Sequence, residues 1–138
     1  MFERCLYFNL NALTRRINQI WDDAFASMEL SPAHAYLLRL VLEEPGLSPK
    51  QIGEALKLKK STVTRFIDGL EFKGFVDRRR GGELDSRLIS IYPTSQARAI
   101  QNELQQQEEK LYQSLCITLG EERVQELVQL SKQTLEKL

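Results

Sequence analysis

Two short helical segments lie only three residues apart in this chain, and that spacing restricts the fold more than any other feature. The first opens at Ser48-Pro49-Lys50-Gln51, which supplies a hydroxyl N-cap, a proline in the first turn and the glutamine of a capping box. The second spans about residues 60–73 and ends at Gly74. Because only Lys57-Leu58-Lys59 separates them, the two segments are predicted to form a helix-turn-helix.

The spacing of apolar residues changes from helical to alternating after Gly74. Residues 75–79 and 88–92 are typical of two strands, and Arg80-Gly81-Gly82-Glu83 between them permits a tight turn. We therefore predict a β-hairpin, or wing, directly after the helix-turn-helix. Pro93-Thr94 ends this hairpin and starts a long polar helix.

Charge is concentrated in one part of an otherwise balanced chain. The 138 residues, 42% hydrophobic and 28% charged, predict one folded globular domain. There are 19 Lys and Arg against 19 Asp and Glu, but residues 57–87 hold nine basic and five acidic side chains, a local charge of +4. Because no apolar run could span a bilayer and Glu3 and Arg4 interrupt any signal-peptide core, we expect a cytoplasmic protein without a membrane partner.

The second helical segment has the side chains expected of a DNA recognition helix. Its early outer positions are Ser61, Thr62, Thr64 and Arg65. Small hydroxyl side chains can bond to bases or phosphates without blocking close approach, and Arg65 can pair with guanine through two hydrogen bonds. We predict that this helix enters the major groove of double-stranded DNA.

Two lysines, Lys59 and Lys60, precede this helix, where the positive end of the helix dipole disfavours cations. Ser31-Pro32 predicts the start of an earlier core helix, and Ser48 that of the helix before the turn, so the sequence supplies conventional caps elsewhere. Two lysines at this end therefore indicate contact with DNA phosphates. The alternative is that both lysines are only solvated, and that Ser61 caps a helix starting one turn later.

The hairpin extends the basic surface with Arg78, Arg79, Arg80 and Arg87. Guanidinium groups are attracted by the negative potential of the minor groove, so these arginines are predicted to contact DNA, with Asp85 orienting Arg87. An ordinary solvated, charged hairpin is the alternative.

Three motifs occur in order along the basic segment: Ser61-Thr62-Val63-Thr64-Arg65, then Leu70-Glu71-x-Lys73-Gly74-Phe75-Val76-x-Arg78, then Asp85-x-Arg87 followed by Thr94. In these motifs the chain resembles the MarR (multiple antibiotic resistance regulator) family, and the resemblance runs essentially from end to end. It implies a homodimer with intertwined terminal helices that binds a pseudo-palindromic operator, usually as a repressor released by a small ligand or an oxidant. Pro93 and Ala97 depart from the family, where leucine and glycine are more usual.

Two apolar stripes, on the helix at residues 2–25 and on the last helix, are too long for so small a core to cover. The interface residues predicted from them are Leu6, Leu10, Leu13, Val124, Leu127, Leu135 and Leu138. The alternative is that the stripes pack on one another within one chain. The predicted fold is mainly α and a single domain, with a winged helix-turn-helix at residues 30–93 and a dimerisation region at residues 1–29 and 94–138.

The resemblance also implies an effector site between the winged part and the dimer helices. The aromatic residues considered for this crevice are Trp21, Phe25, Tyr36 and Tyr112, which are equally expected in a core. Cys5 lies near the start of the first helix, as in the family's organic-hydroperoxide sensors, although a free thiol is the commoner state, and Cys116 is expected in the core.

Nothing in the sequence indicates an enzyme, a cofactor or a metal site. His34 is the only histidine and is predicted on a helix surface, the two cysteines lack metal-ligand spacing, and no Gly-rich phosphate loop occurs. The remaining rival function is a winged helix used only for protein contacts. That rival predicts no salt-dependent affinity for DNA.

Overall fold

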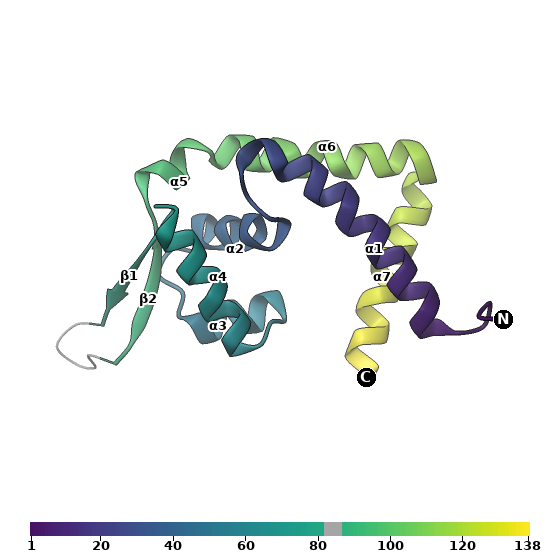
Figure 1. Cartoon of the computed structure of the whole chain (residues 1–138), viewed down its shortest axis with the longest axis horizontal. Coiled ribbons are helices and arrows are strands. Elements are labelled where there is room, and N and C mark those ends of the chain that lie inside the picture. Colours follow the sequence, from purple (N-terminus) through teal and green to yellow (C-terminus); the bar gives the residue numbers. More distant parts are fainter. Residues whose placement is uncertain (82–86) are drawn as a thin grey trace. The chain divides into compact units, whose positions relative to one another are not determined.

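The computed structural model describes residues 1–81 and 87–138. In this part of the chain it is mainly helical, with one antiparallel hairpin (Figure 1). The elements are α1 (Leu6–Phe25), the 3₁₀ turn η1 (Ala26–Met28), α2 (Pro32–Glu43), α3 (Pro49–Leu56), α4 (Lys60–Phe72), β1 (Val76–Arg80), β2 (Ile89–Pro93), α5 (Ser95–Ala99), α6 (Gln101–Leu119) and α7 (Glu121–Lys137). This order agrees with the predicted fold class.

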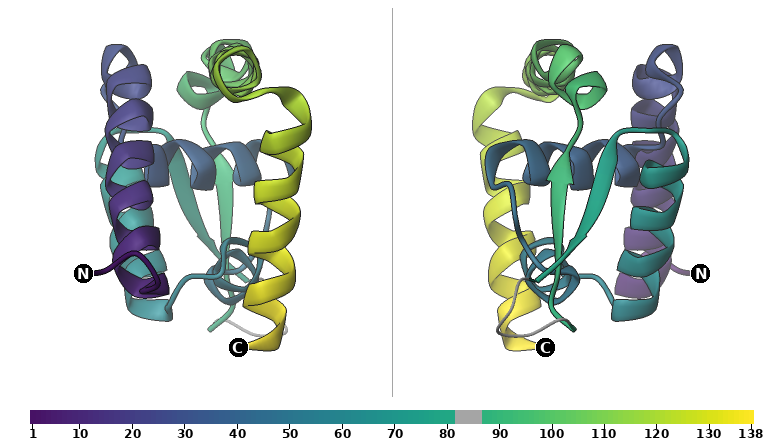
Figure 2. Two further views of the ribbon diagram at one scale, coloured as in Figure 1. Left: turned by 90° about the vertical axis from the view of Figure 1, so that its right-hand side faces the viewer. Right: turned by 90° about the vertical axis from the view of Figure 1, so that its left-hand side faces the viewer.

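The chain forms two compact units, residues 1–104 and residues 105–138. The centre of the first unit is α2, which contacts α1, α3, α4, α5 and β2. The right-hand view of Figure 2 shows α2 running behind the hairpin. The completely buried side chains of α2 are Ala35, Leu37, Leu38 and Val41. Packing against these elements explains why residues 35–42 of α2 are largely apolar.

Hydroxyl side chains start two of these helices, as predicted. Ser31 accepts a hydrogen bond from the backbone N–H of His34 and starts α2. Ser48 and Gln51 form a complete capping box at the start of α3. Because these contacts satisfy backbone N–H groups that have no partner within the helix, they define where each helix begins.

Gly74 and Thr94 join the end of α4 to the hairpin and to α5. Gly74 has φ +82°, and a Cβ there would lie 2.8 Å from the side-chain oxygen of Gln96, so this helix stop requires glycine. The Thr94 hydroxyl donates to the Gly74 carbonyl oxygen at 2.6 Å and accepts from the Ala97 N–H at 3.3 Å. One side chain therefore anchors the base of the wing and caps the next helix.

In the hairpin, Val76 pairs with Pro93 and Arg80 with Ile89. Alternation along β1 buries Val76 and leaves Asp77 exposed. Leu47 adds an isolated bridge to Ile91, which ties the hairpin to the loop before α3.

Some boundaries differ from the sequence prediction. The helix α1 begins at Leu6 rather than at Phe2, and the Asn9 carboxamide donates to the carbonyl oxygens of Phe2 and Cys5 just before it. The long helix after Thr94 is interrupted at Ile100, whose N–H bonds to the Ala97 carbonyl with the spacing of a 3₁₀ turn. Both strands lie one residue further along the chain than predicted.

The second unit contains most of α6 and all of α7. Within it Leu111 and Val124 are buried, whereas Leu127, Leu130 and Leu135 are exposed. Across residues 1–81 and 87–138, no helix combines the length and the apolar character that crossing a membrane requires.

Candidate nucleic-acid interface

The start of α4 is unusual because its N-cap residue is a lysine. Lys59 has extended backbone angles, makes no side-chain capping bond, and is followed directly by helical Lys60. The alternative in which Ser61 caps a later helix is therefore wrong. Two cations lie where the helix dipole is positive, an arrangement that a bound anion would stabilise.

The outer face of α4 presents the side chains predicted for base reading. Ser61, Thr64 and Arg65 are exposed, and Thr62 is half-buried. The Thr64 hydroxyl donates to the carbonyl oxygen of Lys60 at 3.0 Å, which holds it close to the helix. The Arg65 guanidinium lies 5.6 Å from the centre of the Phe66 ring. Arg65 thus combines an exposed position with a side chain partly ordered by an aromatic neighbour.

Arg78 does not project freely from the wing, because it pairs with two carboxylates of α4. Its guanidinium donates to Glu71 Oε1 at 2.9 Å and to Asp68 Oδ1, and its backbone N–H donates to Glu71 Oε2. These contacts fasten β1 to α4. We therefore interpret Arg78 as a residue that positions the wing, a role that the sequence prediction of direct DNA contact did not foresee.

The neighbouring arginines have other surroundings. Arg79 is exposed, and its guanidinium stacks over the Tyr92 ring at 4.1 Å from the ring centre. Arg80 and Arg87 are also exposed. Asp85, predicted to orient Arg87, lies outside the described residues. Arg79 and Arg80 are the wing cations of β1 that this geometry leaves available to a nucleic acid.

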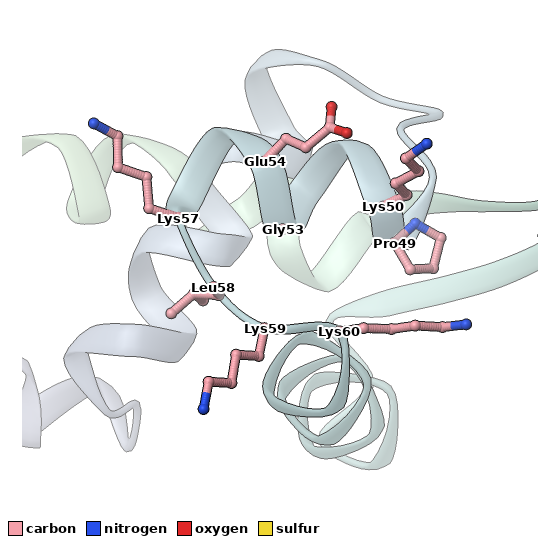
Figure 3. A pocket seen from close by; sticks show the side chains of 8 residues that line it. All are labelled: Pro49, Lys50, Gly53, Glu54, Lys57, Leu58, Lys59 and Lys60. Carbon is pink, nitrogen blue, oxygen red and sulfur yellow. The ribbon is translucent and has the colours of Figure 1, made fainter. Parts of the chain in front are cut away.

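A hollow of about 480 Å³ lies between α3 and the start of α4 (Figure 3). Its lining residues are Pro49, Lys50, Gly53, Glu54, Lys57, Leu58, Lys59 and Lys60. Lys59 and Lys60 are among the predicted DNA contacts, whereas Lys50 and Lys57 are not. The sequence signal that could have pointed to Lys50 and Lys57 is their position at the two ends of the short helix that precedes the turn.

His34 is half-buried against α4 rather than on a free helix surface as predicted. Its ring meets the Phe66 ring edge-on at 5.2 Å, and a Cβ at Gly69 would lie 3.1 Å from it. Glycine therefore allows α2 and α4 to approach closely. Burial lowers the pKa of His34, and the charge of Lys73 lowers it further.

The predicted interface residues differ in exposure. In α1, Leu6, Leu10 and Leu13 are 64%, 49% and 43% exposed, which leaves an apolar stripe in contact with solvent. In α7 and the residue after it, Leu127, Leu135 and Leu138 are exposed, whereas Val124 is buried. Within its own unit, each predicted stripe therefore has exposed leucines.

The predicted effector aromatics do not all lie on a surface. Phe25 is completely buried, Tyr36 is half-exposed, and their rings meet edge-on with centres 6.5 Å apart. Trp21 donates its indole N–H to the Tyr36 hydroxyl at 3.0 Å. Tyr112 belongs to the second unit. The first three aromatics therefore form one cluster, in which Phe25 is a core residue.

Both thiols are free, with Cys5 exposed and Cys116 partly buried. Over residues 1–81 and 87–138 the structure groups no three histidine, cysteine or carboxylate side chains in a way that could hold a metal ion.

Comparison with known proteins gives consistent matches. Residues 30–83 match the model of the MarR family. The HTH-type transcriptional repressor YetL from Bacillus subtilis (strain 168) is 32% identical over 96 residues, which make up 68% of this chain and 57% of the relative. The S. aureus MepR–DNA complex has a TM-score of 0.86 at 19% identity, covering 99% of this chain and 100% of that one. The repressor CouR bound to a 23-mer DNA duplex has a TM-score of 0.86 at 21% identity, over 96% and 94%.

A tight turn between α3 and α4, followed by a two-stranded wing, defines a winged helix-turn-helix protein. Solved structures share this arrangement over nearly the whole chain. The chain belongs to the MarR family, as its motifs predicted. Its curated relatives are transcriptional regulators and not enzymes, in agreement with our expectation, and the chain spans 50% to 60% of their length.

Proposed function

We propose that this chain binds duplex DNA sequence-specifically, as a dimer, and regulates transcription. The observation that carries the proposal is the exposed face of α4, where Ser61, Thr64 and Arg65 follow an N-terminus flanked by lysines. Hydroxyl and guanidinium groups at the start of such a helix are suited to reading base edges in the major groove. Related structures that contain DNA support the proposal through their fold.

The wing adds a second contact to this proposal. Arg79 and Arg80 extend from β1 with exposed side chains, and slender arginine-bearing ribbons fit the narrow minor groove. The ion pairs of Arg78 with Asp68 and Glu71 hold this strand against α4. The helix α4 and the wing would therefore bind DNA as one rigid surface.

A dimer is proposed because exposed leucines continue along α1 and α7. A pair of reading helices related by two-fold symmetry would match a pseudo-palindromic operator. We further propose repression released by a small effector that binds near the Trp21–Tyr36 cluster, with oxidation of exposed Cys5 as the less favoured signal. The expected compartment is the cytoplasm.

The test is selection of duplexes from a random-sequence library, followed by affinity measurements on the selected DNA across a salt series. The proposal expects one enriched pseudo-palindrome and a linear fall of log affinity with log salt. Sedimentation of the free and DNA-bound protein should show two protomers. A winged helix used only for protein contacts would enrich no sequence and give no salt-dependent DNA affinity.

A further inference from the structure

Arg65 is restrained by an aromatic ring and not by a carboxylate. Its guanidinium carbon lies 5.6 Å from the centre of the Phe66 ring, within the range of a cation–π contact. The acidic residue three positions further along α4 is Asp68, and its carboxylate pairs with Arg78. In the described part of the chain, no carboxylate lies within ion-pair distance of Arg65. An aromatic ring restricts a guanidinium without occupying the N–H donors that a base contact needs.

The Phe66 ring is itself held by a residue of another helix. Phe66 is half-buried, and the His34 ring of α2 meets it edge-on, with ring centres 5.2 Å apart and ring planes at 87°. A Cβ at Gly69 would lie 3.1 Å from the His34 ring, so glycine at this position of α4 lets His34 reach Phe66. The contacts therefore run from α2 through the Phe66 ring to Arg65. We name His34 and Phe66 the aromatic brace.

Restricting Arg65 before binding lowers the entropic cost of reading a base. An arginine side chain has many rotamers, and fixing them in a bidentate contact opposes binding. A side chain that is already restricted loses less freedom, which is the general advantage of preorganisation. Because base contacts carry the sequence information, this gain falls on the operator and not on mixed-sequence DNA.

We propose that the aromatic brace positions Arg65 for a base edge and so increases the operator preference without contacting DNA itself. This inference rests on the proposed function, in which Arg65 reads a base, and it assigns Phe66 and His34 as positioning residues. The alternative is that the Phe66 ring contacts a thymine methyl group directly. The two can be separated, because an effect that acts through Arg65 disappears when Arg65 is removed.

The test measures the ratio of operator affinity to mixed-sequence affinity by fluorescence anisotropy. Phe66→Leu keeps an apolar side chain but removes the ring, and it should reduce this ratio by about threefold per protomer, or about tenfold for a dimer. Phe66→Tyr keeps a ring and should stay within about twofold of wild type. In the Arg65→Ala background, Phe66→Leu should change the ratio by less than about twofold. The slope of log affinity against log salt should be unchanged in Phe66→Leu, because no charge is removed.

The matched control is Phe72→Leu, the same substitution at an exposed position of α4 whose ring has no arginine over it in the described chain. This control should keep the wild-type ratio. His34→Gln leaves Phe66 in place and should lower the ratio in the same direction, whereas His34→Phe, which restores a ring, should not. Circular dichroism and sedimentation check the fold and the protomer number of every variant.

Each contrary outcome has a distinct meaning. A folded Phe66→Leu protein with the wild-type ratio overturns the proposal, and a loss of equal size with and without Arg65 overturns it in favour of direct contact between Phe66 and DNA. If Phe66→Leu does not fold, the His34 variants decide, and a folded His34→Gln protein with the wild-type ratio overturns the brace. If the wild-type protein shows no operator preference, or if Arg65→Ala keeps that preference in full, the proposed function or its base-reading residue fails, and the proposal fails with it.

Discussion

Arg78 and Arg79 are adjacent on β1 but have different partners, so replacing each with glutamine separates two roles of the wing. Arg78→Gln removes both ion pairs to α4, whereas Arg79→Gln removes an exposed guanidinium that stacks on Tyr92. Each change removes one positive charge and keeps a polar side chain. Each variant therefore serves as the matched control for the other.

The structure predicts different magnitudes for the two variants. The side chains of Asp68 and Glu71 are 61% and 44% exposed, so each ion pair contributes only about 0.2–1 kcal/mol. We expect Arg78→Gln to lower the free energy of unfolding by about 1 kcal/mol. Its effect on the salt slope should be small, because two carboxylates already neutralise this guanidinium. Arg79→Gln should reduce the slope by about 0.9 per protomer, or about 1.8 per dimer.

The assays are urea unfolding followed by circular dichroism and DNA affinity measured across a salt series. A double-mutant cycle of Arg78→Gln with Glu71→Gln should give a coupling energy of about 0.5–1 kcal/mol. If Arg78→Gln reduces the salt slope as much as Arg79→Gln does and shows no coupling to Glu71, the two arginines do not have the separate roles described.

Three further outcomes are expected. Arg65→Ala should abolish the preference for the selected operator while leaving the dimer folded, and an operator preference equal to wild type in gel shifts would show that another residue reads the DNA. Thr94→Val should lower the free energy of unfolding by about 2 kcal/mol in thermal or urea unfolding, because it removes a helix cap and the hydrogen bond to the Gly74 carbonyl. Thr94→Ser keeps the hydroxyl and should lower it by less than half of that amount. The pKa of His34 is lowered in the folded protein, so the unfolded chain binds a proton more readily as the pH falls below the ordinary value near 6.5, and the folded state loses stability there. The free energy of unfolding, measured against pH, should show this loss in the wild type and less of it in His34→Gln. Equal pH profiles would contradict the assignment.

Much of the site could be predicted because its signals are local. The caps at Ser31 and Ser48, the stop at Gly74 and the polar face around Arg65 each depend on residues within one helix or turn. Steric and hydrogen-bonding preferences over a few residues decide such features. Lys50 and Lys57 were not among the predicted site residues, because Lys59 and Lys60, which line the same hollow, come from the start of another helix.

The sequence by itself determined the order of elements, the helix boundaries set by caps and glycines, and the basic segment, because these depend on residues close together in the chain. Only the tertiary structure decided that Arg78 turns to Asp68 and Glu71 while Arg79 stacks on Tyr92. It also decided that His34 packs under Gly69. These contacts join separate elements, and the same local pattern is compatible with several partners until the packing of α2, α4 and the two strands selects one.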